Sequence, residues 1–352
     1  MGFKGVVPFV MGSLFVAGCY TGGEAIDAVD EIEAMRNLHT NTIRWNNIRW
    51  NDLVWNNIRW NNIRWNAVRM NNIRWNNIRW NNIRWNGVEW PSTALEGSSL
   101  VISRNVDGLW QRRGGLDLIG MEIDLEVDVL DAQGQPGRRD FVIHVDDIHV
   151  DDTWDDVYYY ELSIGLKGSN ERQPLCAEDN AAIPLRHYWD EQTGDRIDDD
   201  EVITFACTSG VLAHCVQWGY RPWAEAKRCD KWNKDKQHKD DCEQVALADY
   251  HQACTRMARA DYCGTGEAWT VPGTPIDIYD HLFEQIEAPE TDWPVEAEWT
   301  PDGAYCLDDI RQQAWKAEGK YPHCGGGAAK KVKDCGSLKD HRALLSSKYE
   351  DD

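Results

Sequence analysis

The chain has 352 residues, of which 42% are hydrophobic and 27% are charged, so it is long enough for a sizeable core and is not a wholly disordered protein. Its 37 Lys and Arg against 59 Asp and Glu give a formal net charge of -22. This balance argues against a dedicated nucleic-acid-binding protein unless the basic residues gather in one segment.

The N-terminus has the pattern of a signal peptide. Lys4 precedes a largely apolar run over residues 5–18, and Cys19 follows Val16-Ala17-Gly18. This order resembles a bacterial lipobox, in which the cysteine is lipidated and becomes the first residue of the mature chain. A glycine-rich run of about fourteen residues is shorter than the roughly twenty that span a bilayer, which disfavours a transmembrane anchor. We expect a signal peptide over residues 1–18 and a lipidated tether and cap over residues 19–40.

The residue after the cysteine bears on location. Tyr20 stands where lipoproteins retained at the inner membrane of many bacteria carry Asp. We therefore expect a cell-envelope protein that is anchored through its lipid, at the outer membrane, and that faces the periplasm or the cell surface.

Residues 41–90 are ten uninterrupted pentads of the form Asn-x-(Ile/Leu/Val)-x-(Trp/Met). A period of five scatters the aliphatic residues around a helix and alternates them between the faces of a straight strand. A chain that turns once per pentad keeps them on one side. The array resembles the pentapeptide-repeat family, which implies a short β-solenoid with these residues inside. The alternatives are an array that orders only on a partner and a substrate for enzymes that crosslink Trp.

The array is basic although the chain is acidic. Eight Arg against Asp52 and Glu89 give the array a charge of +6, which leaves -28 on the rest of the chain. Guanidinium groups bind phosphate and carboxylate, and indole rings favour membrane interfaces and sugar faces. We expect the array to bind an anionic lipid, a glycan or an acidic protein surface, this chain's own acidic part included, whereas nucleic acid does not suit the compartment. The candidate binding residues are Arg44, Arg49, Arg59, Arg64, Arg74, Arg79, Arg84, Trp45, Trp50, Trp60, Trp65, Trp75, Trp80 and Trp85.

Ten cysteines besides Cys19 lie in the second half of the chain, an even number that predicts five disulfides. The alternative is a zinc site, but the closest cysteines are eight or nine residues apart and form no CxxC pair. Their spacing does not determine the pairing. The ten are Cys176, Cys207, Cys215, Cys229, Cys242, Cys254, Cys263, Cys306, Cys324 and Cys335.

After Pro91 the pattern changes to alternating strands separated by turn signals, followed by two helices. This order predicts an α+β domain after the solenoid, and then a Gly/Lys-rich tail over residues 325–352 that Cys335 ties back. The expected strands are residues 98–103, 118–130, 140–150, 157–164 and 202–206, and the expected helices are residues 209–218 and 241–261.

Short motifs in this half carry a resemblance. Ala260-Asp261-Tyr262-Cys263 follows His251-Gln252-Ala253-Cys254, with Phe205–Gly210 and Trp218–Trp223 upstream. This set resembles the signature of the bacterial ADYC domain, a family found mainly in myxobacteria. The resemblance covers residues 95–324 and implies an envelope or secreted protein, without a mechanism. The pentads lie outside it.

Four features of the sequence are candidates for chemical sites. The acidic residues between Asp146 and Asp156 offer oxygen ligands for calcium but lack the spacing of an EF-hand, which favours solvated turns, and the same holds for Asp198–Asp200. Ser209 is expected to cap the helix that follows it. His251 lies ten residues before Asp261 on one predicted helix, too far for a dyad, so we expect a structural role. We therefore predict no catalytic residue, no metal and no cofactor.

These observations favour an envelope lipoprotein that acts as a binding or structural module, with the Arg/Trp face of the repeats as its binding surface. The alternative is a secreted hydrolase with an acidic active cleft in the ADYC-like domain.

Overall fold

The computed structural model describes residues 92–130, 136–176, 181–190, 192–200, 202–229, 242–271, 273–324, 335 and 343–350, and the backbone of short strands at 39–40, 54–55, 58–59, 83–85 and 88–90. For residues 125–130 and 136–139, too, only the backbone is described. The proposed signal peptide, Cys19 and most of the pentads lie outside these ranges.

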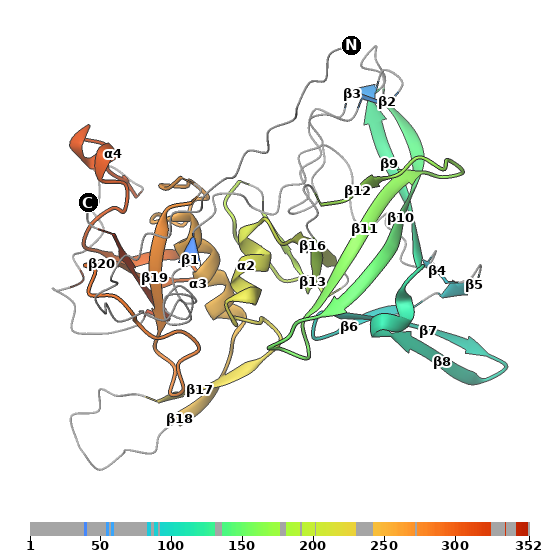
Figure 1. Cartoon of the computed structure of the whole chain (residues 1–352), viewed down its shortest axis with the longest axis horizontal. Helices are drawn as coiled ribbons and strands as arrows, with labels where there is room; N and C mark the ends of the chain where they lie inside the picture. The colour runs from blue at the N-terminus through green and yellow to red at the C-terminus, as the bar shows by residue number, and fades with distance from the viewer. Residues whose placement is uncertain are drawn as a thin grey trace, which may run out of the picture. The chain divides into compact units, whose positions relative to one another are not determined.

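The larger of the two main sheets has eight strands, all antiparallel to their neighbours. Its three longest strands, β9, β10 and β11, are neighbours in the sheet and run side by side in Figure 1. In sheet order the strands are β16 (Ile203–Cys207), β13 (Ala182–Arg186), β11 (Tyr158–Leu166), β10 (Pro136–Val150), β9 (Glu122–Leu130), β4 (Ile83–Trp85) and β5 (Val88–Trp90), with β12 (Gln173–Pro174) beside β11.

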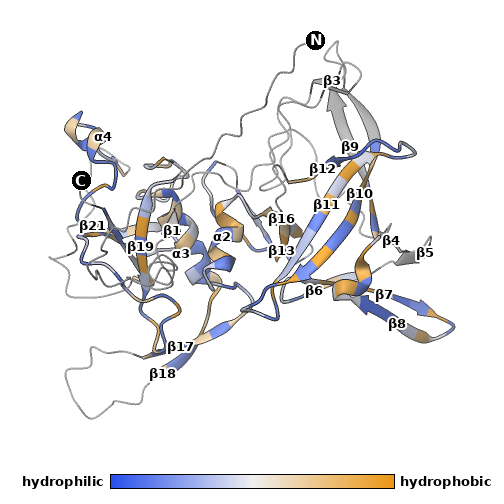
Figure 2. Cartoon of the chain, in the orientation of Figure 1, coloured by the Kyte–Doolittle hydropathy of each residue, from blue (hydrophilic) through white to orange (hydrophobic). Residues whose placement is uncertain are grey.

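Alternation along these strands places one face of the sheet against a hydrophobic core. In β10, Phe141, Ile143 and Val145 are buried, and a bulge between Val145 and Asp147 shifts the pattern so that Ile148 is buried as well. Figure 2 shows the resulting orange and blue segments along β10.

A three-stranded sheet contributes to the same core. It contains β6 (Ser92–Glu96), β7 (Ser99–Val106) and β8 (Leu109–Gly114), and a short 3-10 turn, η3 (Gly115–Leu118), follows it. Leu100 and Ile102 of β7 are fully buried in this core.

The second core lies between a helix and the other main sheet. Helix α3 (Ala248–Arg259) contacts β20, β21 and β22, and its buried side chains include Tyr250 and Met257. The shorter α2 (Val211–Gln217) contacts α3, and α4 (Gln313–Ala317) is a single turn. The strands of this sheet, in order, are β1 (His39–Thr40), β19 (Pro275–Asp280), β22 (Leu345–Tyr349), β20 (Val295–Thr300) and β21 (Gly303–Leu307).

Two further hairpins complete the described elements of the second half. They are β14 (Tyr188–Trp189) with β15 (Arg196–Ile197), and β17 (Glu225–Cys229) with β18 (Cys242–Ala246). None of the helices in the described part of the chain is long and apolar enough to cross a membrane.

The predicted fold class, a β-solenoid followed by an α+β domain, is wrong. The described strands of the repeats form antiparallel hairpins, β2 (Val54–Trp55) with β3 (Ile58–Arg59) and β4 with β5. In the sequence, Asn86-Gly87 separates β4 from β5, and these residue types at this spacing favour a two-residue hairpin turn. Over residues 83–90, two three-residue strands are separated by two residues, which matches the period of five without a solenoid.

The rest of the described chain is mainly β rather than α+β. The helix predicted over residues 241–261 begins only at Ala248, because residues 242–246 form β18 and pair with β17. The helix predicted over residues 209–218 is the seven-residue α2.

The two ends of the repeat region are held by different sheets. His39 and Thr40 in β1 pair with β19 of the five-stranded sheet, whereas Ile83 and Arg84 in β4 pair with β9 of the eight-stranded sheet. The last pentads are thus part of the domain's own sheet.

Five disulfides confirm the number predicted from the ten cysteines. Two of them tie α2 to α3 and β17 to β18. The pairs are Cys176–Cys207, Cys215–Cys254, Cys229–Cys242, Cys263–Cys324 and Cys306–Cys335.

Candidate functional site

The Ala-Asp-Tyr-Cys motif terminates α3. Ala260 has a φ of +51°, a left-handed conformation that ends the helix. The buried carboxylate of Asp261 then accepts a hydrogen bond from Nη1 of Arg256 at 2.6 Å and from the backbone N–H groups of Thr265 and Gly266 at 3.0 and 2.8 Å. Asp261 therefore fastens the turn after the helix to the helix itself.

Tyr262 joins a second buried network. Its hydroxyl donates to Oε1 of Glu296 at 2.6 Å and accepts the backbone N–H of Arg311 at 3.2 Å. The guanidinium of Arg311 donates to both oxygens of Glu296, at 2.7 and 2.8 Å, and the Ser347 hydroxyl donates to Oε2 at 2.8 Å. Burial raises the pKa of Tyr262 well above its ordinary value, so the phenol keeps its proton.

Both networks connect α3 to segments distant in the sequence. Arg256 has a fully buried side chain and donates to the carboxylate of Asp195 and to the backbone oxygens of Thr193 and Pro301. Because a buried charge is costly unless it is paired and hydrogen-bonded, these contacts define a structural framework.

His251 fits the structural role expected for it. The ring is fully buried, and Nε2 lies 2.9 Å from the backbone oxygen of Leu212, so Nε2 carries the donated proton. Burial lowers the pKa of His251 to about 4, which keeps the ring neutral near pH 7. The hydrogen bond joins α3 to α2.

Ser209 does not cap a helix, contrary to the prediction. The residue before α2 is Gly210, in an extended conformation, and no side chain accepts a hydrogen bond at this N-terminus. The serine lies one position too early to reach the first turn.

The acidic run is used in turns and ion pairs. Asp151 accepts the backbone N–H groups of Thr153 and Trp154 and the hydroxyl of Tyr159, and Asp156 binds Arg221. Over the described ranges, no three His, Cys, Asp or Glu side chains are placed to hold a metal ion.

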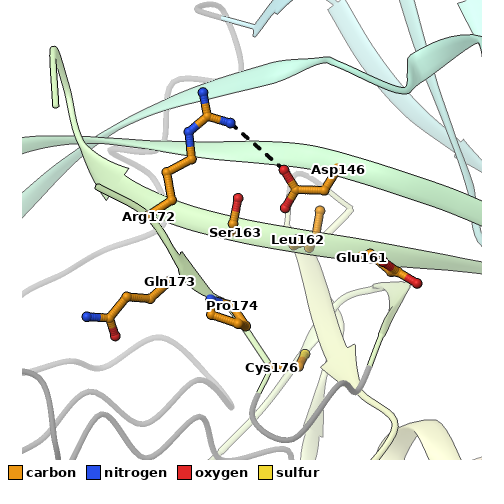
Figure 3. Close-up of a pocket in the computed structure, with 8 residues that line it drawn as sticks. All are labelled: Asp146, Glu161, Leu162, Ser163, Arg172, Gln173, Pro174 and Cys176. Carbon is orange, nitrogen blue, oxygen red and sulfur yellow. Dashed lines mark ion pairs between the residues drawn. The ribbon is translucent and has the colours of Figure 1, made fainter. Parts of the chain in front are cut away.

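The larger candidate site is a pocket of about 360 Å³ beside β10, β11 and β12. Figure 3 shows Arg172 and Asp146 extending toward one another across it, and their ion pair measures 3.9 Å. The buried Ser163 hydroxyl lies between these strands and has no hydrogen-bond partner in the described structure. Asp146 comes from the bulge in β10, which explains how an otherwise regular strand turns a carboxylate toward the pocket. The complete lining is Asp146, Glu161, Leu162, Ser163, Arg172, Gln173, Pro174 and Cys176.

The pocket is lined by positively charged, negatively charged and neutral polar side chains, which together offer hydrogen-bond donors and acceptors. One guanidinium, two carboxylates, a hydroxyl and an amide suit a small polar ligand that both donates and accepts hydrogen bonds. Arg172 and Asp146 are each more than 40% exposed, so both remain reachable from solvent.

A second pocket, of about 170 Å³, lies where β6, β13 and β15 approach Trp223. His187 accepts the backbone N–H of Asp199 on Nδ1 at 3.0 Å, so in the neutral ring the proton is on Nε2. Arg196 donates to Asp198 at 2.8 Å and leaves its buried Nη1 without a partner among the described residues. The volume suits only a small group.

The binding residues predicted in the repeats are not tested by these contacts. Cys19 and the Arg and Trp side chains of the pentads lie outside the described residues, and only the backbone of a few, such as Arg59, Arg84 and Trp85, is placed. The ten disulfide cysteines are all described and all paired.

Both pockets were missed from the sequence. Arg172, Ser163 and Gln173 lie in ordinary polar contexts, and only the fold brings them to Asp146. A sequence signal did exist for the buried network, because Tyr262 falls in the Ala-Asp-Tyr-Cys motif that carries the family resemblance.

Comparison with known families gives one result. The model of the ADYC domain matches residues 115–313, more than half of the chain. No curated protein and no solved structure matches the chain significantly.

Proposed function

This chain belongs to the ADYC domain family. From its N-terminal pattern, its disulfides and its charged repeat, we propose that it acts as a binding or structural lipoprotein of the bacterial cell envelope. A lipid on Cys19 anchors it at the outer membrane. The Arg/Trp repeat binds an anionic ligand there, and the ADYC domain is the stable body that carries the repeat.

The envelope location is supported by the cysteines. Five disulfides persist in oxidising compartments and are rare in the cytosol. The apolar N-terminal run ending in Val-Ala-Gly-Cys agrees with export and lipidation. Each of these features comes from a different part of the chain.

The observation that carries the binding role is the separation of charge. A segment of +6 lies within a chain of -22, so the repeat presents a concentration of positive charge that an anionic ligand can neutralise. Arg beside Trp in seven of the ten pentads combines a phosphate-binding fork with a ring that favours the membrane interface. Anionic lipid is the ligand that meets both groups at once.

The ADYC domain supports a framework role. The most deeply buried charged groups, among them Arg256, Asp261, Glu296 and Arg311, are engaged with one another or with backbone groups. Groups held in this way stabilise a fold and are poorly placed to react with a substrate.

The test is binding to vesicles. The mature chain from residue 19, carrying Cys19→Ser so that it has neither the lipid nor the apolar N-terminal run, is mixed with phosphatidylcholine vesicles with and without phosphatidylglycerol, and bound protein is measured by co-sedimentation. We expect binding to the anionic vesicles that weakens as salt rises. Replacing the repeat arginines by Gln should weaken it by at least about tenfold, since each basic residue near an anionic surface contributes about 1 kcal/mol.

The matched control replaces the same arginines by Lys, which keeps the charge. This variant should retain most of the binding. If the Gln variant binds as the parent does, the repeat is not an anionic-lipid ligand, and binding to lipopolysaccharide glycan instead would move the proposal to a sugar.

A further inference from the structure

The β7–β8 hairpin is a rigid projection of the domain. Its two central residues, Asp107 and Gly108, have φ values of +52° and +84°, as the tight turns of two-residue hairpins require. Val106 pairs with Leu109 directly behind the turn, and the N–H of Gly108 donates to Oδ1 of Asn105 at 2.9 Å. The other end of β7 is anchored by buried side chains in the main core.

The tip of this hairpin exposes large apolar side chains. Leu109 is 73% exposed and Trp110 is 70% exposed, more than any other large hydrophobic residue in the described part of the chain. Figure 1 shows the hairpin extending away from β6 and β10, with its turn at the far end. In Figure 2 the body of β8 is hydrophilic, so its apolar residues lie only at the end next to the turn.

The two apolar side chains point in opposite directions. Leu109 and Trp110 are consecutive residues of a strand, and successive side chains of a strand lie on opposite faces. A flat protein surface covers one face of a hairpin, whereas a lipid interface surrounds a tip that enters it. We propose that the β7–β8 tip is a membrane-contacting finger that inserts Leu109 and Trp110 into the interfacial region of a bilayer.

Charged side chains behind the tip set the depth of insertion. Arg104 donates to Gln111 at 2.8 Å, Arg112 pairs with Glu96, and Arg113 lies 3.6 Å from Asp117. Arg112 follows Trp110 by two residues, or about 7 Å along the strand. The finger therefore reaches the boundary of the headgroups and acyl chains and no further, the depth at which Trp is most favourable.

The charges of the finger distinguish it from the repeat. Arg104, Arg112 and Arg113 are balanced by Glu96, Asp107 and Asp117, so the finger is close to neutral. We therefore expect the finger to bind a membrane through apolar contacts that salt does not weaken. The repeat binds through ionic contacts, which salt weakens. The inference deepens the proposed function, since it requires that the protein reside at a membrane.

The first experiment uses the mature chain from residue 19 with Cys19→Ser on phosphatidylcholine vesicles at about 1 M salt, where the screening length falls to about 3 Å. We expect residual binding that falls about tenfold in Leu109→Ser/Trp110→Ser, because the contribution of both apolar side chains is lost. The control is Phe283→Ser, which removes an apolar side chain that is 55% exposed elsewhere in the domain. It should bind as the parent does.

The second experiment changes the charge at the apex. Asp107→Asn keeps a residue that tolerates positive φ and removes the carboxylate that enters the headgroups first. Binding to vesicles with phosphatidylglycerol should rise at least about twofold. Circular dichroism of each variant verifies that the fold is retained.

The outcomes separate the two proposals. If the tip variant loses nothing at high salt, or if Asp107→Asn has no effect, the finger is wrong even when the repeat arginines prove essential. If the tip variant loses binding while the repeat Gln variant does not, the finger stands and the ionic role of the repeat fails. Loss of self-association instead of vesicle binding in the tip variant would assign the tip to a protein contact and overturn the inference.

Discussion

At the scale of single residues, His251 makes the stability of the folded state depend on pH. Its pKa falls from 6.5 in the unfolded chain to about 4 in the folded one, because burial disfavours the charged ring. The unfolded chain therefore takes up a proton below pH 6.5 that the folded chain refuses until about pH 4. The stability that this residue contributes is complete above pH 6.5 and is lost as the pH falls through that window.

The expected loss from His251 is about 3 kcal/mol between pH 6.5 and 4. His251→Gln keeps a donor for the Leu212 carbonyl and has no titrating ring. Urea unfolding of both proteins over this range should show a shallower pH dependence for the variant by about that amount. Parallel curves would show that His251 is protonated in the folded state.

Residue-level prediction from the sequence succeeded where chemistry is local. The even cysteine count indicated five disulfides, but the partner of Cys263 is Cys324, 61 residues away, and spacing contains no information about such a contact. His251 and Asp261 have separate partners, the Leu212 oxygen and the Arg256 guanidinium. The Glu296–Arg311 pair could not be predicted from the sequence, since β20 and the segment that precedes α4 meet only in the folded chain.

At the scale of elements, two disulfides differ in what they hold. Cys215–Cys254 joins α2 to α3 across 39 residues, and both cysteines are fully buried. Cys229–Cys242 closes only 13 residues, at the end of the β17–β18 hairpin. Chain entropy favours the longer closure by about 1 kcal/mol, and burial of the first pair adds to the difference.

Replacing the two cysteines of each pair by Ala should therefore lower the free energy of unfolding by different amounts. We expect about 4 kcal/mol for Cys215→Ala/Cys254→Ala and about 3 kcal/mol or less for Cys229→Ala/Cys242→Ala, measured by chemical unfolding of the oxidised proteins. The Cys229→Ala/Cys242→Ala variant is the control, because it also loses one disulfide but opens a shorter loop. An equal or reversed order would show that α2 and α3 are held together mainly by packing.

Strand prediction was better than the assembly built from it. The strands expected at 140–150, 157–164 and 202–206 correspond to β10, β11 and β16, because alternation reports a half-buried face directly. The solenoid prediction is wrong because it assumes that the chain turns in the same sense at every pentad and winds into a coil. Asn at the pentad boundaries permits the chain to reverse instead, and the pairing partner of β4 in β9 is fixed by tertiary structure.

At the scale of the whole molecule, the lipid anchor is open to direct test. Cells that express the chain and are fed a labelled fatty acid should incorporate it into the wild-type protein and not into Cys19→Ser. The mature protein should also begin at Cys19, because cleavage precedes that residue in a lipoprotein. Tyr20→Ser is the control, and its labelling should be unchanged.

A protein that retains residues 1–18 or takes up no label would contradict the lipoprotein assignment. The disulfides would still support export, since their stability depends on the redox state of the compartment and not on the anchor.

β1 pairs with one sheet and β4 with the other, so residues 41–82 join two ends that are fixed in the domain. The cost of joining such ends rises only with the logarithm of the intervening length, so doubling the number of pentads costs about 0.6 kcal/mol. Copy number in this segment is therefore nearly neutral for the stability of the domain. Related chains are free to gain or lose whole pentads, and with them ligand-binding Arg and Trp, while the last pentads remain fixed as strands of the sheet.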